Sequence, residues 1–251
     1  MKWSIVILAG GVLPPDLARL TQKTYQAELS FGDRRCLDCV VEACRGAGFS
    51  DIVVSAPPVL HNPALGVQWA NAGSTNIQTA LWGAEAVGKT DALLFLPCDV
   101  PLLASEHLRA FIAEVEKQVS FIDQPWVAIG LSPKEWVQRE FPGASYHFMK
   151  FVEGRFASGA LYASSPPVLK LAQEFLLAAG ERRKSLYRLL RVIGWRNVFR
   201  YLAGKVSLEE ADAFTQKFWG VKAVIVRNCH PFTTMDCDTL SDYRYILGYL
   251  Q

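Results

Sequence analysis

Residues 4–11 read SIVILAGG, a short apolar run that ends at two adjacent glycines. A run of this kind is typical of a parallel strand whose two faces are both covered by other parts of the protein. Adjacent glycines allow a tight turn and a close approach of the backbone to a ligand. We therefore expect a buried central strand over residues 4–8, with a candidate binding loop at its carboxyl end.

The residues after this strand alternate between helical and strand patterns. Apolar residues at helical spacing predict helices over 37–44, 76–87 and 105–119, the last capped by Ser105. Apolar runs predict strands over 51–55, 66–70, 91–96 and 126–131, whereas residues 12–30 look irregular. This alternation predicts a doubly wound, three-layer α/β/α fold with a mostly parallel central sheet and a cleft at the carboxyl ends of its strands.

The second half of the chain mixes the two patterns. Strands are expected over residues 146–152, 155–162 and 221–226, and helices over 166–179, 185–202, 207–218 and 240–250. No internal repeat and no linker-like stretch interrupts the sequence. We therefore expect a single domain over residues 1–251 that contains a helical insertion over about 181–219.

Basic and acidic residues nearly balance, at 26 against 24, so the formal net charge is only +2. Such a balance argues against a nucleic-acid-binding protein. No apolar run is long enough to cross a bilayer. The apolar residues near the N-terminus suit a buried strand better than a signal peptide, because no cleavage site follows them. A cytoplasmic protein is the expectation.

The basic residues are concentrated between positions 181 and 205, where eight of them stand against one acidic residue. This stretch carries +7, and the rest of the chain therefore carries −5. Apolar residues recur at helical spacing through 186–202, which favours amphipathic helices packed on the domain with their arginines in water. A peripheral membrane or lipid contact through 184–205, an acidic acceptor and a subunit contact are the alternatives.

The six cysteines do not form the pattern of a zinc site. Cys36 and Cys39 are spaced as a metal-binding pair, but no second cysteine or histidine pair follows at ligand spacing. A chain of this length builds its own core without disulfides. Buried, reduced thiols are therefore the expectation.

Acidic residues follow two of the predicted strands. Asp99 comes just after the strand over 91–96, and Asp236 and Asp238 follow the strand over 221–226. Mg²⁺ in proteins usually binds one or two carboxylates together with substrate phosphates. If the two strands are neighbours, these carboxylates converge on one metal ion. The alternatives are that Asp99 caps a turn and that Asp238 caps the last helix.

Five segments of the sequence carry a family resemblance, and they occur in the family's order. They are LAGG at 8–11, AELSFGDRRCLDCVVEACRGAGFSDIVV at 27–54, AGSTNIQTAL at 72–81, LLFLPCDVPLL at 93–103 and MDCDTLSDYR at 235–244. Together they resemble the MobA-like nucleotidyltransferases, which belong to the NTP transferases with a glycosyltransferase-A-type fold. The resemblance covers most of residues 1–110 and the last part of the chain.

The resemblance implies an enzyme that transfers a nucleoside monophosphate from an NTP to a phosphorylated small molecule, such as a sugar phosphate. Pyrophosphate is released, and Mg²⁺ is the implied cofactor. The implied metal ligands are Asp99 and Asp238, with Asp236 as a further candidate. The implied nucleotide-binding residues are Leu8, Ala9, Gly10, Gly11, Gly73, Ser74, Asn76 and Gln26.

Gln26 departs from the family pattern, because relatives carry a phosphate-binding lysine at this place. Lys23, three residues earlier, is the candidate to replace it as a catalytic residue beside Asp99 and Asp238. The alternative is a catalytically weak or inactive member of the family that binds a nucleotide or a partner.

Overall fold

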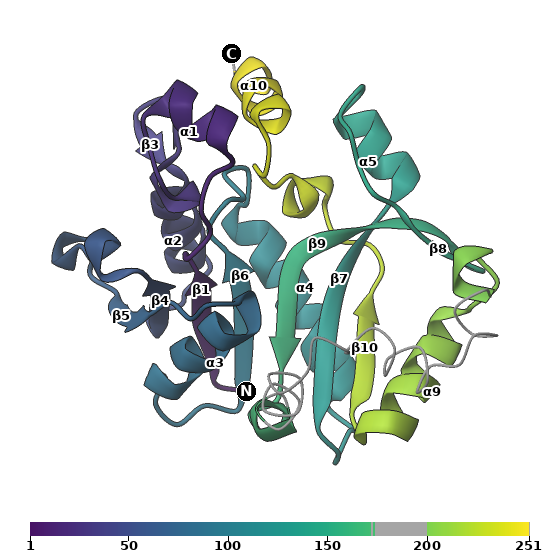
Figure 1. Cartoon of the computed structure of the whole chain (residues 1–251). Helices are drawn as coiled ribbons and strands as arrows, with labels where there is room; N and C mark the ends of the chain where they lie inside the picture. Colours follow the sequence, from purple (N-terminus) through teal and green to yellow (C-terminus); the bar gives the residue numbers. More distant parts are fainter. Residues whose placement is uncertain (172, 174–199, 251) are drawn as a thin grey trace.

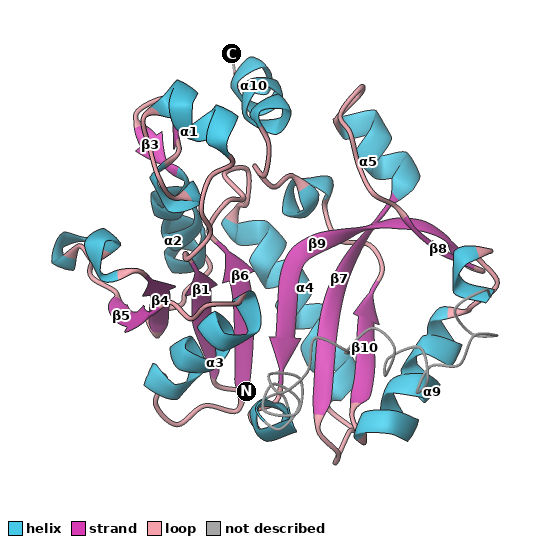
Figure 2. Ribbon diagram, viewed as in Figure 1, coloured by secondary structure: helices cyan, strands magenta, loops and turns pink. Residues whose placement is uncertain are grey.

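The protein folds as one mixed sheet with helices on both of its faces (Figures 1 and 2). The computed structural model describes residues 1–171, 173 and 200–250. The strands are β1 (Trp3–Leu8), β4 (Ile52–Ala56), β5 (Gln68–Asn71), β6 (Ala92–Pro97), β7 (Trp126–Pro133), β8 (Met149–Phe151), β9 (Gly154–Ser164) and β10 (Lys222–Val226), and a separate hairpin of β2 (Ser30–Phe31) and β3 (Arg34–Arg35). The helices are α1 (Pro15–Thr21), α2 (Cys36–Gly46), α3 (Asn76–Ala86), α4 (Ser105–Val119), α5 (Lys134–Glu140), α9 (Leu208–Trp219) and α10 (Leu240–Tyr249). The predicted α/β fold with a mostly parallel sheet is confirmed.

Strand β1 lies inside the sheet, between β6 and β4. The strands follow the order β10-β7-β9-β6-β1-β4-β5, with β8 paired to β9. β1 is parallel to both of its neighbours, so that Ile5 pairs with Ile52 of β4 and with Leu94 of β6. The long strand β9 runs antiparallel to β6 and β7, and this makes the sheet mixed. With neighbours on both sides and helices on both faces, β1 is mostly apolar, and its polar residue, Ser4, is buried and donates a hydrogen bond to Oδ2 of Asp51.

Successive residues of β1 serve opposite faces of the sheet. Ile5 and Ile7 belong to the core that α2 and α4 cover, whereas Val6 packs with Ala84 of α3 on the other face. Because both faces of β1 are buried, its sequence does not alternate between apolar and polar residues. All six cysteines are free and buried, and burial raises the pKa of the Cys44 thiol to about 12. The expected buried thiols are thereby confirmed.

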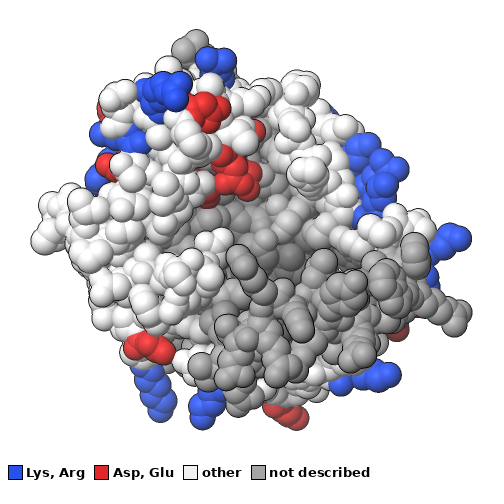
Figure 3. All heavy atoms as spheres, viewed as in Figure 1, with Lys and Arg blue, Asp and Glu red and all other residues white. Residues whose placement is uncertain are grey.

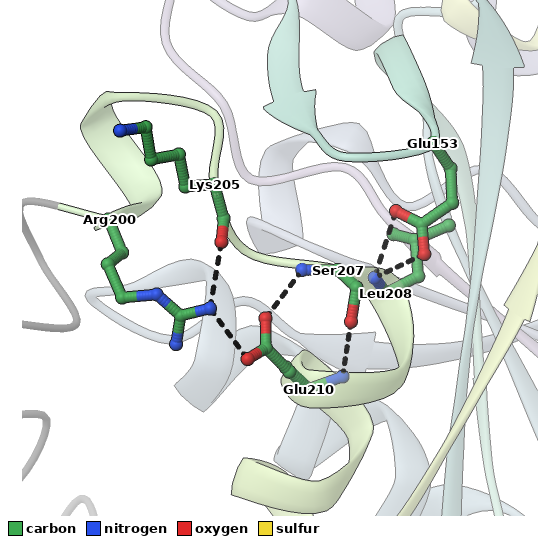
Figure 4. Close-up of polar contacts among 6 residues, drawn as sticks. All are labelled: Glu153, Arg200, Lys205, Ser207, Leu208 and Glu210. Atoms are coloured by element: carbon green, nitrogen blue, oxygen red, sulfur yellow. Dashed lines mark hydrogen bonds and ion pairs between the residues drawn. The ribbon is translucent and has the colours of Figure 1, made fainter.

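A hydrogen-bonded turn holds the start of α9 against the sheet (Figure 4). Glu153, in the turn between β8 and β9, accepts hydrogen bonds from the backbone N–H of Leu208 at 2.9 and 3.1 Å. Ser207 and Glu210 cap the same helix end reciprocally. Arg200 binds Glu210 and the backbone oxygen of Lys205. Two of the basic residues between 181 and 205 therefore lie in a local turn.

Two local predictions were wrong. Residues 12–30 are not irregular throughout, because Pro15 begins helix α1, where its missing N–H costs nothing. Ser105 is the first residue of α4 rather than its cap. The cap position is Ala104, whose backbone N–H donates to Nδ1 of His107 at 3.1 Å. The helix α5 and the β2–β3 hairpin were also absent from the predicted elements.

The predicted helical insertion is described only in part. Residues 174–199 lie outside the described residues, and with them most of the basic segment over 184–205 and of the helix expected over 185–202. The helix expected over 207–218 is α9. Within the described ranges, none of the helices has the length and apolar character needed to cross a membrane.

The close packing of α3 on the sheet can be tested by substituting Gly83, which faces β1 and β4. A Cβ atom on Gly83 would lie 2.4 Å from Cγ1 of Val6 and 3.3 Å from Cβ of Ser55. We therefore expect Gly83→Ala to lower the free energy of unfolding by about 1–3 kcal/mol, because the extra methyl group overpacks the core. Urea unfolding of the purified protein measures this change.

Gly88→Ala is the matched control, since no atom lies within 4 Å of the added Cβ atom there. Its free energy of unfolding should stay within about 0.5 kcal/mol of the wild type. Equal effects of the two substitutions would contradict the close approach of α3 to β1 and β4.

Candidate active site

A cavity of about 190 Å³ opens at the carboxyl ends of β1 and β6. This is the edge at which doubly wound sheets bind their ligands. Acidic side chains gather beside a hollow on this face of the molecule (Figure 3). The cavity is lined by Leu8, Gly10, Gly11, Gln26, Asn76, Thr79, Pro97, Asp99, Asp236 and Asp238. Because ligand pockets usually exceed about 300 Å³, this space suits part of a ligand, such as phosphate groups with a cation.

The loop after β1 is held tightly at both ends. Ala9 donates its N–H to the backbone oxygen of Ser55 at 2.8 Å, and the oxygen of Gly11 accepts from the N–H of Gln26 at 3.0 Å. A Cβ atom on Gly10 would lie 2.8 Å from Cβ of Ala72. Among the described residues, none accepts a hydrogen bond from the N–H groups of Gly10 and Gly11. These two donors can therefore serve an anion in the cavity.

Asp99 is a nearly buried carboxylate in this cavity. Its exposed fraction is 7%, and its Oδ1 atom has no hydrogen-bond partner within the described part of the chain. Burial, followed by the charges of Asp236 and Asp238, raises the pKa of Asp99 from 3.8 to about 7. The free oxygen caps no turn, so the group is left with an unmet demand for positive charge.

Asp236 and Asp238 reach the cavity by a different path from the one expected. β10 pairs with β7, so β7 and β9 separate it from β6, and the two strands are not neighbours. The segment after β10 crosses back over the end of the sheet, where the N–H of Cys237 donates to the backbone oxygen of Asp99 at 3.0 Å. The two strands are therefore not neighbours, which was the condition set for the carboxylates to converge, but the three carboxylates line one cavity all the same.

The two flanking carboxylates differ in their surroundings. Partial desolvation and the charge of Asp238 raise the pKa of Asp236 to about 6, although its side chain keeps contact with solvent. Asp238 does not cap the last helix, because Thr239 accepts from the N–H of Asp242 in that role. Instead, Oδ1 of Asp238 accepts a hydrogen bond from Nε2 of Gln26 at 2.8 Å.

Of Gln26 and Lys23, only Gln26 lines the cavity. Gln26 lines the cavity, and its Oε1 atom lies 1.8 Å from where a Cβ of Gly11 would stand. Lys23 is exposed and does not line the cavity. The side chain that the sequence offered as a substitute for a phosphate-binding lysine is therefore not part of the cavity wall.

Around the start of α3, the cavity is lined by residues of the helix and not by the turn that precedes it. Asn76 and Thr79, one helical turn apart, line the cavity. Gly73 and Ser74 do not, and their N–H groups bond to side chains of α3, to Thr79 Oγ1 at 3.0 Å and to Gln78 Oε1 at 2.8 Å. Thr79 was missed by the sequence analysis, although its position three residues after Asn76 places both on one face of the helix.

The donor set fits a hard divalent cation that also binds a phosphate ligand. No group of three or more His, Cys, Asp and Glu side chains among the described residues is arranged as a complete metal site. The cavity does offer carboxylate oxygens, one of them unpartnered and nearly buried. Mg²⁺ commonly binds one or two carboxylates and completes its ligand set with water and substrate phosphates.

Comparison with known proteins gives the same picture of the fold. A hypothetical transferase from Thermus thermophilus is 25% identical, with a TM-score of 0.79, over 97% of this chain and 100% of its own. CMP:2-keto-3-deoxy-manno-octonic acid synthetase in complex with CTP is 13% identical, with a TM-score of 0.59, over 100% and 98%. The manganese complex of Rv0371c from Mycobacterium tuberculosis is 16% identical, with a TM-score of 0.51, over 99% of each chain. No curated protein matches the sequence significantly.

The family itself follows from the sequence match over most of the chain. Residues 5–202 match the model of the MobA-like NTP transferase domain. This match spans the strands and loops that build the cavity on the N-terminal side, and it confirms the resemblance noted in the sequence. The chain belongs to the MobA-like NTP transferase family.

Proposed function

We propose that the protein is a Mg²⁺-dependent nucleotidyltransferase that transfers a nucleoside monophosphate from an NTP to a phosphorylated small molecule. The observation that carries the proposal is the nearly buried oxygen of Asp99, which has no hydrogen-bond partner among the described residues and lies in a cavity that Gly10 and Gly11 also line. An anion-binding turn beside an unsatisfied carboxylate is what a phosphate ligand and its cation require. Family membership supports the class of reaction.

Each part of the cavity has a task in the proposed complex. The N–H groups of Gly10 and Gly11 bind phosphate oxygens, and Asn76 contacts the nucleotide from the start of α3. Asp99 and Asp238 hold the cation, with Asp236 at the edge of the same cavity. When bound, Mg²⁺ supplies the positive charge that polarises and orients the phosphates. Lys23 has no part in this arrangement, since it does not line the cavity.

The reaction needs no protein nucleophile. An acceptor phosphate oxygen attacks the α-phosphorus and forms a new P–O bond, while the bond from the α-phosphorus to its leaving oxygen breaks. Pyrophosphate departs with that electron pair. A phosphate monoester has a second pKa of about 6, so its attacking oxygen is already largely deprotonated at neutral pH. The protein's contribution is then to align the two substrates and to neutralise charge.

Pyrophosphate release is the direct test of this function. Each of the four common NTPs, paired with a panel of sugar phosphates and other phosphorylated acceptors, is incubated with the protein and Mg²⁺. We expect one pair to release pyrophosphate, and Asp99→Ala to lower kcat/KM for that pair by about 100-fold or more, because it removes the buried cation ligand. Asp123→Ala, which changes an exposed carboxylate outside the cavity, should leave turnover unchanged.

Two outcomes would contradict parts of the proposal. Full turnover in Asp99→Ala would exclude the assigned metal site. Nucleotide binding without pyrophosphate release from any pair would exclude catalysis, and it would favour the second candidate, a nucleotide-binding relative that does not turn its ligand over. Among the residues that the structure describes, no lysine, arginine or histidine lines the cavity, and this observation keeps the second candidate open.

The buried charge of Asp99 also predicts how stability varies with pH. Because its pKa is higher in the folded protein than in the unfolded chain, the folded state binds more protons between about pH 4 and 7. The carboxylate therefore lowers the free energy of unfolding as the pH rises through that range. In metal-free buffer, we expect Asp99→Asn to stabilise the protein relative to wild type by about 2 kcal/mol more at pH 8 than at pH 5.

Urea unfolding in the presence of EDTA at both pH values measures this difference. Asp123→Asn, which changes an exposed carboxylate outside the cavity, is the control, and the pH-dependent difference is expected for Asp99→Asn alone. A pH-independent effect of Asp99→Asn would show that Asp99 does not carry an uncompensated charge in the folded protein.

A further inference from the structure

Gln26 is wedged between the glycine loop and the acidic residues. Its backbone N–H donates to the oxygen of Gly11 at 3.0 Å, and its backbone oxygen accepts from Leu29 at 3.1 Å. Its side-chain oxygen occupies the space that a Cβ atom of Gly11 would need. Its Nε2 atom donates to Oδ1 of Asp238 at 2.8 Å. The amide therefore lies beside Gly11 and binds one oxygen of Asp238, and the other oxygen has no hydrogen-bond partner among the described residues.

In the described part of the chain, the cavity wall has three carboxyl groups and no basic side chain. Asp99, Asp236 and Asp238 line it, and among the described residues no lysine, arginine or histidine does. A polyphosphate that enters alone would therefore meet carboxylates of its own sign at short range.

We infer that Gln26 makes nucleotide binding by this protein depend wholly on a divalent cation. As a neutral donor, Gln26 orients Asp238 without reducing the negative charge that attracts the cation. The cation site is accordingly preformed before any nucleotide arrives. Two N–H groups from glycines do not offset three carboxylates, so the phosphates enter only with the cation in place. Gln26 is a positioning residue in this scheme, and the inference rests on the proposed nucleotide-binding function.

The effect of a cation at this position can be worked out from the same contacts. In Gln26→Lys, the ammonium group would pair with Asp238 and would lower the charge that attracts a divalent cation. It would also offer the phosphates a positive partner. Gln26→Leu would remove the donor to Asp238 and add no charge. The two variants therefore separate orientation of the carboxylate from the charge of the site.

Two binding measurements on the full-length protein test the inference, and neither needs turnover. Mn²⁺ binding without nucleotide is followed by the loss of the free-ion electron paramagnetic resonance signal. Binding of each of the four radiolabelled NTPs is measured by equilibrium dialysis, with Mn²⁺ or with EDTA. For wild type we expect Mn²⁺ to bind without nucleotide, and the preferred NTP to bind at least 100-fold more weakly in EDTA than with Mn²⁺.

The variants should move these affinities in different directions. Gln26→Lys should weaken Mn²⁺ binding to the nucleotide-free protein by at least tenfold and strengthen NTP binding in EDTA by at least tenfold. Gln26→Leu should weaken Mn²⁺ binding by about tenfold, as expected for loss of a hydrogen bond to a ligand, and leave NTP binding in EDTA unchanged. Thermal unfolding monitored by circular dichroism establishes that each variant is folded.

Gln118→Lys is the matched control. Gln118 is also half-buried and also donates to a carboxylate, Oε1 of Glu114 at 2.9 Å, but it lies on α4 and does not line the cavity. It should change neither affinity. Changes equal to those of Gln26→Lys would reduce the effect to overall charge and would overturn the inference.

The remaining outcomes distinguish this inference from the proposed function. Wild-type NTP binding that is equally tight with Mn²⁺ and with EDTA would overturn the role of Gln26, and pyrophosphate release would still stand as evidence of the function. Mn²⁺ affinity that is the same in wild type, Gln26→Lys and Gln26→Leu would likewise overturn it. Failure of every NTP to bind with Mn²⁺ present would remove the nucleotide site itself, and with it both the function and the inference.

Discussion

The hydrogen bond from the N–H of Cys237 to the backbone oxygen of Asp99 is the contact on which the candidate site depends. It fixes the segment between β10 and α10 against the end of β6. Cys237 stands between Asp236 and Asp238, so this one contact sets the position of both carboxylates. The residue is fully buried, and Met235 and Cys237 belong to a second apolar cluster that includes residues of α1, α5 and α10. A core of apolar side chains thus holds a group of acidic ones.

Such an arrangement stores a local electrostatic cost within a stable fold. The raised pKa values of Asp99 and Asp236 reflect this cost, since burial first and the neighbouring carboxylates second make each group harder to ionise. The sheet around β1 is apolar on both faces and supplies the stability that offsets this cost. The site gains affinity for a cation because its charge is left uncompensated. The charge of Asp99 therefore lowers the stability of the fold and raises the affinity of the site for a cation.

The sequence predicts the parts of the fold that local patterns determine. β1, β4 and β6 are buried on both faces, and their apolar runs, each ended by turn residues, identify them without any knowledge of their neighbours. The cavity at their carboxyl ends follows from the same alternation. Strand order does not, because the wide crossing from β10 back to Asp99 leaves no local pattern in the sequence. The sequence could therefore state the adjacency of the two strands only as a condition, and the carboxylates meet without it.

The contact between Gln26 and Asp238 is a second feature that local sequence patterns do not predict. A hydrogen bond between residues so far apart in the chain is determined by tertiary packing, and no spacing rule predicts it. Sequence comparison shows only that Gln26 is an unexpected residue, whereas the structure shows what its amide binds.

The position of Gln26 also explains why the space beside Gly11 is not open to a ligand. A glycine after a buried strand invites the interpretation that a ligand needs the room that a side chain would fill. Here the side chain of Gln26 already lies in that room, since its Oε1 atom would overlap a Cβ atom on Gly11. A side chain at position 11 would therefore displace the amide of Gln26, and with it the hydrogen bond from Nε2 of Gln26 to Asp238.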